Sequence, residues 1–73
     1  MQPTTDLQYR IAIQQVSKIC YPHWYYDKGI CYYGVVTDYG VIGNTRKKKN
    51  QWKSAYDTLV QMKKIPVKSL ITI

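Results

Sequence analysis

Four consecutive cations, Arg46-Lys47-Lys48-Lys49, are the residues best suited to chemistry in this sequence. The helical spacing of the apolar residues after them places the four at the start of a helix. Cationic side chains beside the free backbone N–H groups of a helix start can bind an anion such as phosphate. The helix dipole disfavours cations at that end by about 0.3–1 kcal/mol each, a cost that a docked anion would offset. The alternative interpretation is a solvated charge run or a frayed first turn.

Aromatic side chains form the second set of candidate binding groups. The sequence has eight tyrosines, two tryptophans and no phenylalanine. A tyrosine ring packs on apolar groups while its hydroxyl stays in water, so such rings can remain at a surface. His23, Tyr25 and Tyr33 are expected on the more polar face of a sheet, where they would stack on unpaired bases or pack on a peptide. A second, thinner hydrophobic layer is the alternative role for them.

The remaining titratable residues do not indicate catalysis. Asp27 and Asp38 lie in turn-like segments, where backbone capping alone explains an aspartate. No serine or cysteine nucleophile has an identifiable base beside it. Cys20 and Cys31, with a lone His23, are too few ligands for zinc, so neither a metal nor a cofactor is expected. We therefore expect a binding protein that is not an enzyme.

Length and charge limit the class of protein. Seventy-three residues predict one small domain over residues 1–73, with no room for a deep substrate cleft. Eleven Lys and Arg against four acidic residues give a net charge of +7, which either solubilises the surface or attracts a polyanion or an acidic protein. No signal peptide or long apolar run is evident. Two cysteines that form no disulfide framework are typical of reduced thiols. A cytoplasmic monomer without membrane contact is expected.

One amphipathic helix is predicted near each end of the chain. Thr5 and Gln8 have capping-box spacing, and an apolar stripe extends that helix as far as Tyr21-Pro22: Tyr9, Ala12, Ile13, Val16 and Cys20. The second helix is expected from about Thr45 to Lys64, before Pro66, with a stripe of Trp52, Ala55, Tyr56, Leu59 and Val60. Residues 67–73 are expected to form an edge strand or a loose tail.

Two Asp-x-Gly turns between the helices predict a three-stranded meander, with strands near residues 23–26, 30–37 and 41–44. With three-residue turns, Tyr26 would oppose Ile30 and Val36 would oppose Ile42. The helix-covered face would carry Trp24, Tyr26, Ile30, Tyr32, Val36 and Ile42. The open face would carry His23, Tyr25, Cys31, Tyr33, Val35, Thr37 and Val41. A slip of one residue would exchange the two sets.

The predicted fold class is therefore α/β of the α+β type: a helix, a three-stranded antiparallel meander and a second helix, with both helices on one face of the sheet.

The segment Gly43-Asn44-Thr45-Arg46-Lys47 resembles the Gly-x-Ser-Lys-Lys signature that opens the second helix of double-stranded-RNA-binding domains. That family has the same order of elements. The resemblance implies that Arg46 and Lys47 contact phosphates across the RNA groove, with Lys48 and Lys49 adjacent. The sequence departs from the family in its short turn at residues 27–29, in the large residues that replace the paired alanines of the second helix, and in a first helix without glutamate.

In length, basicity and lack of an evident active site, the whole chain also resembles small phage-encoded inhibitors of host RNA polymerase, of the Xanthomonas phage type. This resemblance implies a transcription regulator that binds the large polymerase subunits, inhibits initiation in host shutoff and permits readthrough of terminators. The expected partner is thus host RNA polymerase, in the host bacterial cytoplasm, or alternatively nucleic acid.

Overall fold

The computed structural model describes residues 3–65, which form a helix, a three-stranded antiparallel sheet and a second helix. The elements are α1 (Asp6–Gln14), β1 (Cys20–Asp27), β2 (Ile30–Thr37), β3 (Gly40–Thr45), a 3₁₀ turn η1 (Lys48–Asn50) and α2 (Gln51–Gln61). Strand order in the sheet follows the chain, β1-β2-β3. The predicted fold class is confirmed; the expectation for residues 67–73 lies outside the described residues.

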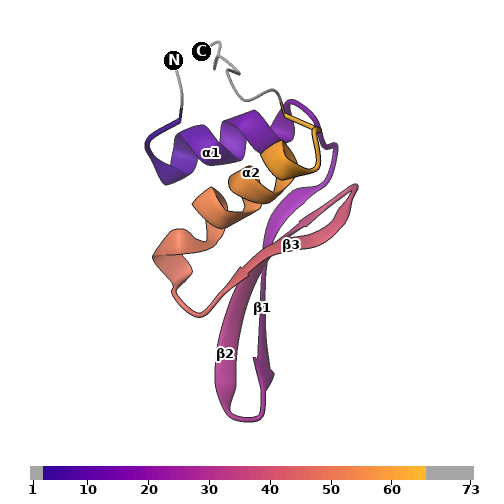
Figure 1. Cartoon of the computed structure of the whole chain (residues 1–73). Helices are drawn as coiled ribbons and strands as arrows, with labels where there is room; N and C mark the ends of the chain where they lie inside the picture. Colours follow the sequence, from indigo (N-terminus) through magenta and orange to yellow (C-terminus); the bar gives the residue numbers. More distant parts are fainter. Residues whose placement is uncertain (1–2, 66–73) are drawn as a thin grey trace.

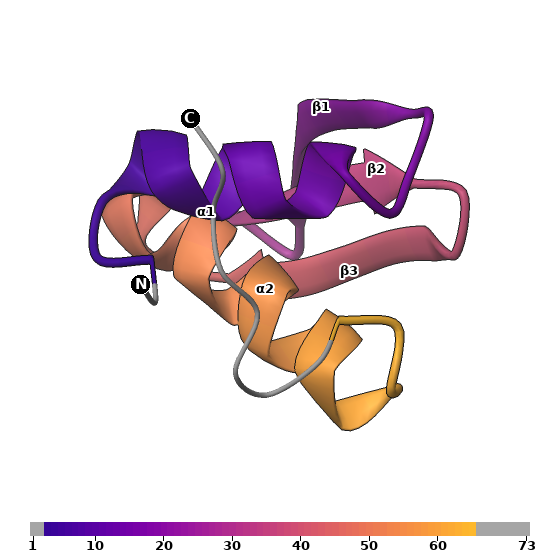
Figure 2. The same ribbon diagram turned by 90° about the horizontal axis from the view of Figure 1, so that it is seen from above.

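Both helices cover the same face of the sheet (Figures 1 and 2). The core lies between the helices and the sheet. It contains two residues of α1, one each of β2 and β3, three of α2 and one residue after α2: Ala12, Ile13, Val35, Ile42, Ala55, Tyr56, Leu59 and Ile65. The β1–β2 hairpin extends well beyond the helices, so its turn is remote from the core (Figure 1). The far half of the hairpin therefore has little covering it.

Helix α1 begins as predicted and ends earlier. The Thr5 side chain accepts from the Gln8 backbone N–H, and the Gln8 side chain accepts from the Thr5 backbone N–H, which completes the capping box. The predicted continuation to Cys20 is wrong, because the helix stops at Gln14 and Cys20 starts β1 opposite Thr37. Beyond the helix, the buried Ser17 hydroxyl accepts from the Asp38 backbone N–H and donates to the Ile19 carbonyl. These contacts join the end of α1 to the β2–β3 turn.

Both hairpin loops contain two residues, which changes the predicted register. Asp27 pairs with Ile30 and Thr37 pairs with Gly40. Lys28 and Gly29 both have positive φ, the pattern of a type I′ turn. Tyr26 therefore opposes Cys31 rather than Ile30. This shift of one residue places every side chain of β2 on the face of the sheet opposite to the predicted one.

The helix-covered face consequently differs from the predicted one in the central strand alone. It carries Trp24 and Tyr26 from β1 and Ile42 from β3, as predicted, but Cys31, Tyr33, Val35 and Thr37 from β2. Ile30, Tyr32 and Val36, predicted on this face, lie on the open one. Val35 is fully buried while Val36 is only partly buried, which agrees with the corrected assignment.

A β-bulge in β3 lets α2 approach the sheet closely. Tyr33 pairs with Thr45 and Val35 with Ile42, so two residues of β3, Gly43 and Asn44, face the single Gly34 of β2. Gly43 is buried with a φ of +71°, and a β-carbon placed on it would collide with the backbone of Ala55 in α2. Gly43 therefore sets the distance between the sheet and α2.

Candidate functional site

The basic run Arg46–Lys49 is exposed, but it precedes the α-helix. Arg46 and Lys47 connect β3 to η1, Lys48 and Lys49 belong to η1, and α2 starts at Gln51. The prediction that all four cations occupy the amino end of an α-helix is therefore wrong for Arg46 and Lys47, which lie outside any helix. Lys48 and Lys49 lie in the 3₁₀ turn that leads directly into α2, so the helix dipole bears on these two alone. For Arg46 and Lys47, attraction of an anion has to come from the charges of the side chains.

The segment of residues 43–47 does not open the second helix either. Gly43–Thr45 belong to β3, and the Thr45 hydroxyl donates to the Lys47 carbonyl in the connection that follows. The positions that the resemblance assigned to a helix start thus lie in a strand and a turn. The role of Arg46 and Lys47 as helix-start phosphate ligands loses its structural basis.

Gln51 fixes where α2 begins. Its side chain is buried, and its amide nitrogen donates to the carbonyl of Gly34 in the middle of β2. The bulge interrupts the β2–β3 ladder at that point, so Gln51 supplies the donor that a regular strand partner would have given. This contact holds η1, with Lys48 and Lys49, beside the sheet.

A groove of about 440 Å³, called here the tryptophan groove, lies where η1 and the start of α2 meet α1 and β1. Each element contributes two residues: Asp6 and Arg10 of α1, Pro22 and Trp24 of β1, Lys48 and Lys49 of η1, and Gln51 and Trp52 of α2. Three cations and one carboxylate line it, so the groove carries a net positive charge. The two tryptophans in its wall are the only ones in the chain.

A cation faces each indole ring of the groove. The Arg10 guanidinium carbon lies 5.2 Å from the centre of the Trp52 ring, and the Lys48 Nζ lies 5.0 Å from the centre of the Trp24 ring. Both distances are within the range of a cation–π interaction. Trp24 is also half exposed, at 51%. The groove therefore presents aromatic surface and positive charge in alternation.

A second hollow of about 260 Å³, called here the hairpin hollow, continues from the groove along the β1–β2 hairpin. Trp24 and Lys48 line both spaces, and Tyr26, Cys31 and Tyr33 complete the hollow. The Tyr33 ring meets Trp24 edge-on, with centres 6.2 Å apart and planes at 74°. The neighbouring Cys31 side chain raises the pKa of Tyr33 through a hydrogen bond and through its charge.

The other face of the sheet carries a separate aromatic cluster. Tyr25 stacks on Tyr32 with ring centres 5.3 Å apart, and His23 lies 5.6 Å from Tyr25. Tyr33, expected beside His23 and Tyr25, is on the opposite face because of the shift in register. The residues singled out from the sequence are thus divided. Lys48, Lys49 and Tyr33 lie at the groove and hollow, His23 and Tyr25 lie on the opposite face of the sheet, and Arg46 and Lys47 line neither space.

Among the lining residues that the sequence analysis missed as binding residues, four supply an aromatic ring or a cation: Arg10, Trp24, Tyr26 and Trp52. Trp24 and Tyr26 were placed on the correct face, but helices were expected to cover them. Arg10 belongs to α1 and Trp52 to α2, and the two residues are 42 positions apart in the sequence. The only sequence signal was the closeness of Trp52 to the basic run.

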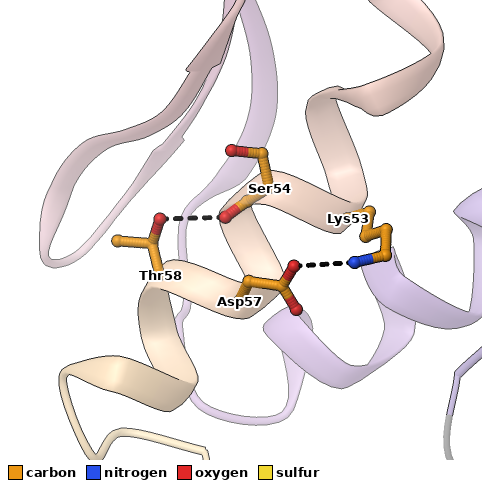
Figure 3. Close-up of polar contacts among 4 residues, drawn as sticks. All are labelled: Lys53, Ser54, Asp57 and Thr58. Carbon is orange, nitrogen blue, oxygen red and sulfur yellow. Dashed lines mark hydrogen bonds and ion pairs between the residues drawn. The ribbon is translucent and has the colours of Figure 1, made fainter.

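A third depression, on the outer side of α2, carries no unbalanced charge. There the Lys53 ammonium lies 2.9 Å from the Asp57 carboxylate, and the Thr58 hydroxyl donates to the Ser54 carbonyl (Figure 3). The hydrogen bond to Asp57 raises the pKa of Lys53. Because each charge already has a partner, this depression offers an anion much less than the tryptophan groove does.

Within residues 3–65, no helix has the length and apolar character needed to cross a bilayer, and no three potential ligand side chains gather as a metal site would require. Comparison with known proteins found no matching family, no similar curated protein and no similar solved structure.

Proposed function

We propose that this chain is a nucleic-acid-binding domain and that the tryptophan groove is its binding site. One observation carries the proposal: Arg10, Lys48 and Lys49 come from separate elements and converge on a groove walled by Trp24 and Trp52. Cationic side chains along a groove can contact the phosphates of a nucleic-acid strand, and aromatic rings beside them can stack on its bases. The net charge of +7 would draw a polyanion to this surface from a distance.

The test is binding of labelled oligonucleotides, followed by fluorescence anisotropy across a range of salt concentrations. Replacing both Lys48 and Lys49 by alanine should weaken binding and flatten the log–log salt dependence by about 1.5, because each phosphate contact contributes about 0.7–0.9 to the slope. Lys18→Ala is the matched control, since Lys18 is exposed and outside the groove. The Asp38 carboxylate accepts from the Lys18 backbone N–H, which alanine retains. Equal salt slopes for the two variants would overturn the proposal.

A second candidate function is regulation of host RNA polymerase by direct binding, as the resemblance to the phage-encoded inhibitors implies. The exposed tyrosines of β1 favour it: Tyr26, 78% exposed, precedes the β1–β2 turn in the half of the hairpin that the helices do not cover (Figure 1), and Tyr21, 52% exposed, lies on the open face of the sheet. Large exposed aromatic rings are common anchors in protein interfaces.

This second function is tested with purified bacterial RNA polymerase in a pull-down and in a promoter-dependent transcription assay. Binding should bring down the large subunits and reduce initiation, and a combined Tyr21→Ser and Tyr26→Ser variant should lose both effects. A terminated template adds a test of readthrough. If purified polymerase is neither retained nor inhibited, this function is excluded, whatever the outcome with oligonucleotides.

A further inference from the structure

We infer that the tryptophan groove and the hairpin hollow take a single strand whose unpaired bases stack on Trp24 and Trp52. This inference rests on the proposed function and specifies its ligand class. Its basis is the pairing of each indole face with a cation, Arg10 with Trp52 and Lys48 with Trp24, inside one groove.

Phosphate binding alone would not need the tryptophans. Lysine and arginine at an exposed surface suffice for contacts to a duplex backbone, whose bases are stacked inside the helix. Trp24 nevertheless leaves half of its surface in contact with solvent beside three cations. Stacking of a base on an aromatic ring contributes about 1–3 kcal/mol and requires a base with a free face, as a single strand provides.

The cations over the rings can change partner when a strand arrives. Lys48 Nζ is held over Trp24 at 5.0 Å by a contact that is weak at an exposed site. A phosphate is a stronger partner for an ammonium than an aromatic ring is, so the lysine would move to the backbone and leave the indole face to the base. Arg10 would release Trp52 in the same way.

The hairpin hollow gives the strand a direction along the molecule. It shares Trp24 and Lys48 with the groove and continues to Tyr26 and Tyr33. Successive bases would therefore meet Trp52, Trp24 and then the tyrosines, with Lys48 between the two spaces.

The experiment uses the fluorescence of the two tryptophans, which line the groove and, for Trp24, also the hollow. The full chain is titrated with oligothymidylate and oligouridylate of about 12 nucleotides, with the matching duplex, and with an abasic phosphodiester of equal length. Both base-bearing single strands should quench the fluorescence and bind at least tenfold more tightly than the abasic strand, since one stacked base is worth about a factor of ten. The thymidylate and uridylate arms distinguish DNA from RNA as the source of the strand.

Two variants locate the contact. Trp24→Ala should lose about tenfold in affinity for oligothymidylate and no affinity for the abasic strand. Trp52→Phe keeps an aromatic ring against the core and leaves Trp24 as the single fluorescent reporter. Tyr25→Ala is the matched control, because this ring lies on the other face of the sheet and its removal should change neither affinity nor quenching.

The outcomes distinguish failure of the base-stacking site from failure of the proposed function. Equal binding of abasic and thymidylate strands, or a duplex that binds as tightly as the single strand, would overturn the stacking site while leaving a nucleic-acid-binding domain in place. Absence of binding to all four ligands would overturn the proposed function and this inference together.

Discussion

Lys48 is the residue that both parts of the proposed binding surface share. It lines the tryptophan groove and the hairpin hollow, and its ammonium faces Trp24. The groove-facing position comes from η1, which Gln51 holds beside β2. A single side chain thus joins a charge contact and an aromatic contact.

Gly43 is the residue at which a substitution should be most damaging to the fold. Gly43→Ala should lower the free energy of unfolding by about 3 kcal/mol, from a left-handed backbone cost of about 1–2 kcal/mol and an overpacking cost of about 1–3 kcal/mol against Ala55. Urea denaturation followed by circular dichroism measures the change.

Gly29→Ala separates the two causes. Gly29 also has a positive φ, of +79°, but an added β-carbon would meet nothing within 4 Å. Its substitution should cost only about 1 kcal/mol, the conformational part alone. Equal losses for the two variants would show that close packing of α2 on the bulge is not what requires glycine at position 43.

At the scale of elements, the end of α2 contains a residue that the helix does not favour. Lys63 has a φ of +61°; its N–H donates to the Val60 carbonyl, and the Lys64 N–H donates to the Leu59 carbonyl. This is a Schellman motif with lysine where glycine is usual. Lys63→Gly should therefore raise the free energy of unfolding by about 0.5–1 kcal/mol.

Thermal denaturation of the Lys63→Gly variant provides the measurement. Lys64→Gly is the control, because that residue has no positive φ and its Nζ lies 5.0 Å from the centre of the Tyr39 ring. The melting temperature of the Lys64→Gly control should not rise above that of the unaltered chain. A melting temperature for Lys63→Gly at or below that of the unaltered chain would contradict the account of this helix end.

At the scale of the whole molecule, stability should fall in alkaline solution. Burial raises the pKa of the Cys20 thiol and of the Tyr56 phenol, and the hydrogen bond with Asp57 raises the pKa of Lys53. Each group holds its proton more tightly in the folded chain than in the unfolded one. The unfolded chain therefore loses protons first as pH rises, and the free energy of unfolding decreases with pH.

Cys20 should account for the earliest part of that decrease, because the ordinary pKa of a thiol, 9.0, is lower than that of a phenol, 10.0. Urea denaturation between about pH 8 and pH 11 should show a decline from about pH 9 in the unaltered chain and from about pH 10 in a Cys20→Ala variant. Curves of identical shape for the two proteins would contradict the assignment to Cys20. Loss of charge from exposed lysines affects both proteins equally and cancels in the comparison.

The sequence alone determined the order of the elements, the capping box at Thr5 and the bounds of β2, residues 30–37. These features depend on residues close together in the chain, through turn chemistry, side-chain periodicity and local hydrogen bonds. The composition also indicated that tyrosine rings can remain at the surface, and Tyr21, Tyr25, Tyr26 and Tyr39 are exposed, as are all four residues of the basic run.

Tertiary structure alone decided where α1 ends, where α2 starts, on which face of the sheet each β2 side chain lies, and which residues line the groove. Ser17 bonds to Asp38 and Gln51 to Gly34, contacts that cross 21 and 17 positions of sequence, and each moves a helix boundary that periodicity had placed elsewhere. A loop shorter by one residue turned Tyr33 to the groove side of the sheet. Arg10, Trp24 and Trp52 meet only because α1, β1 and α2 pack together, and no local pattern encodes a contact between elements so far apart in the chain.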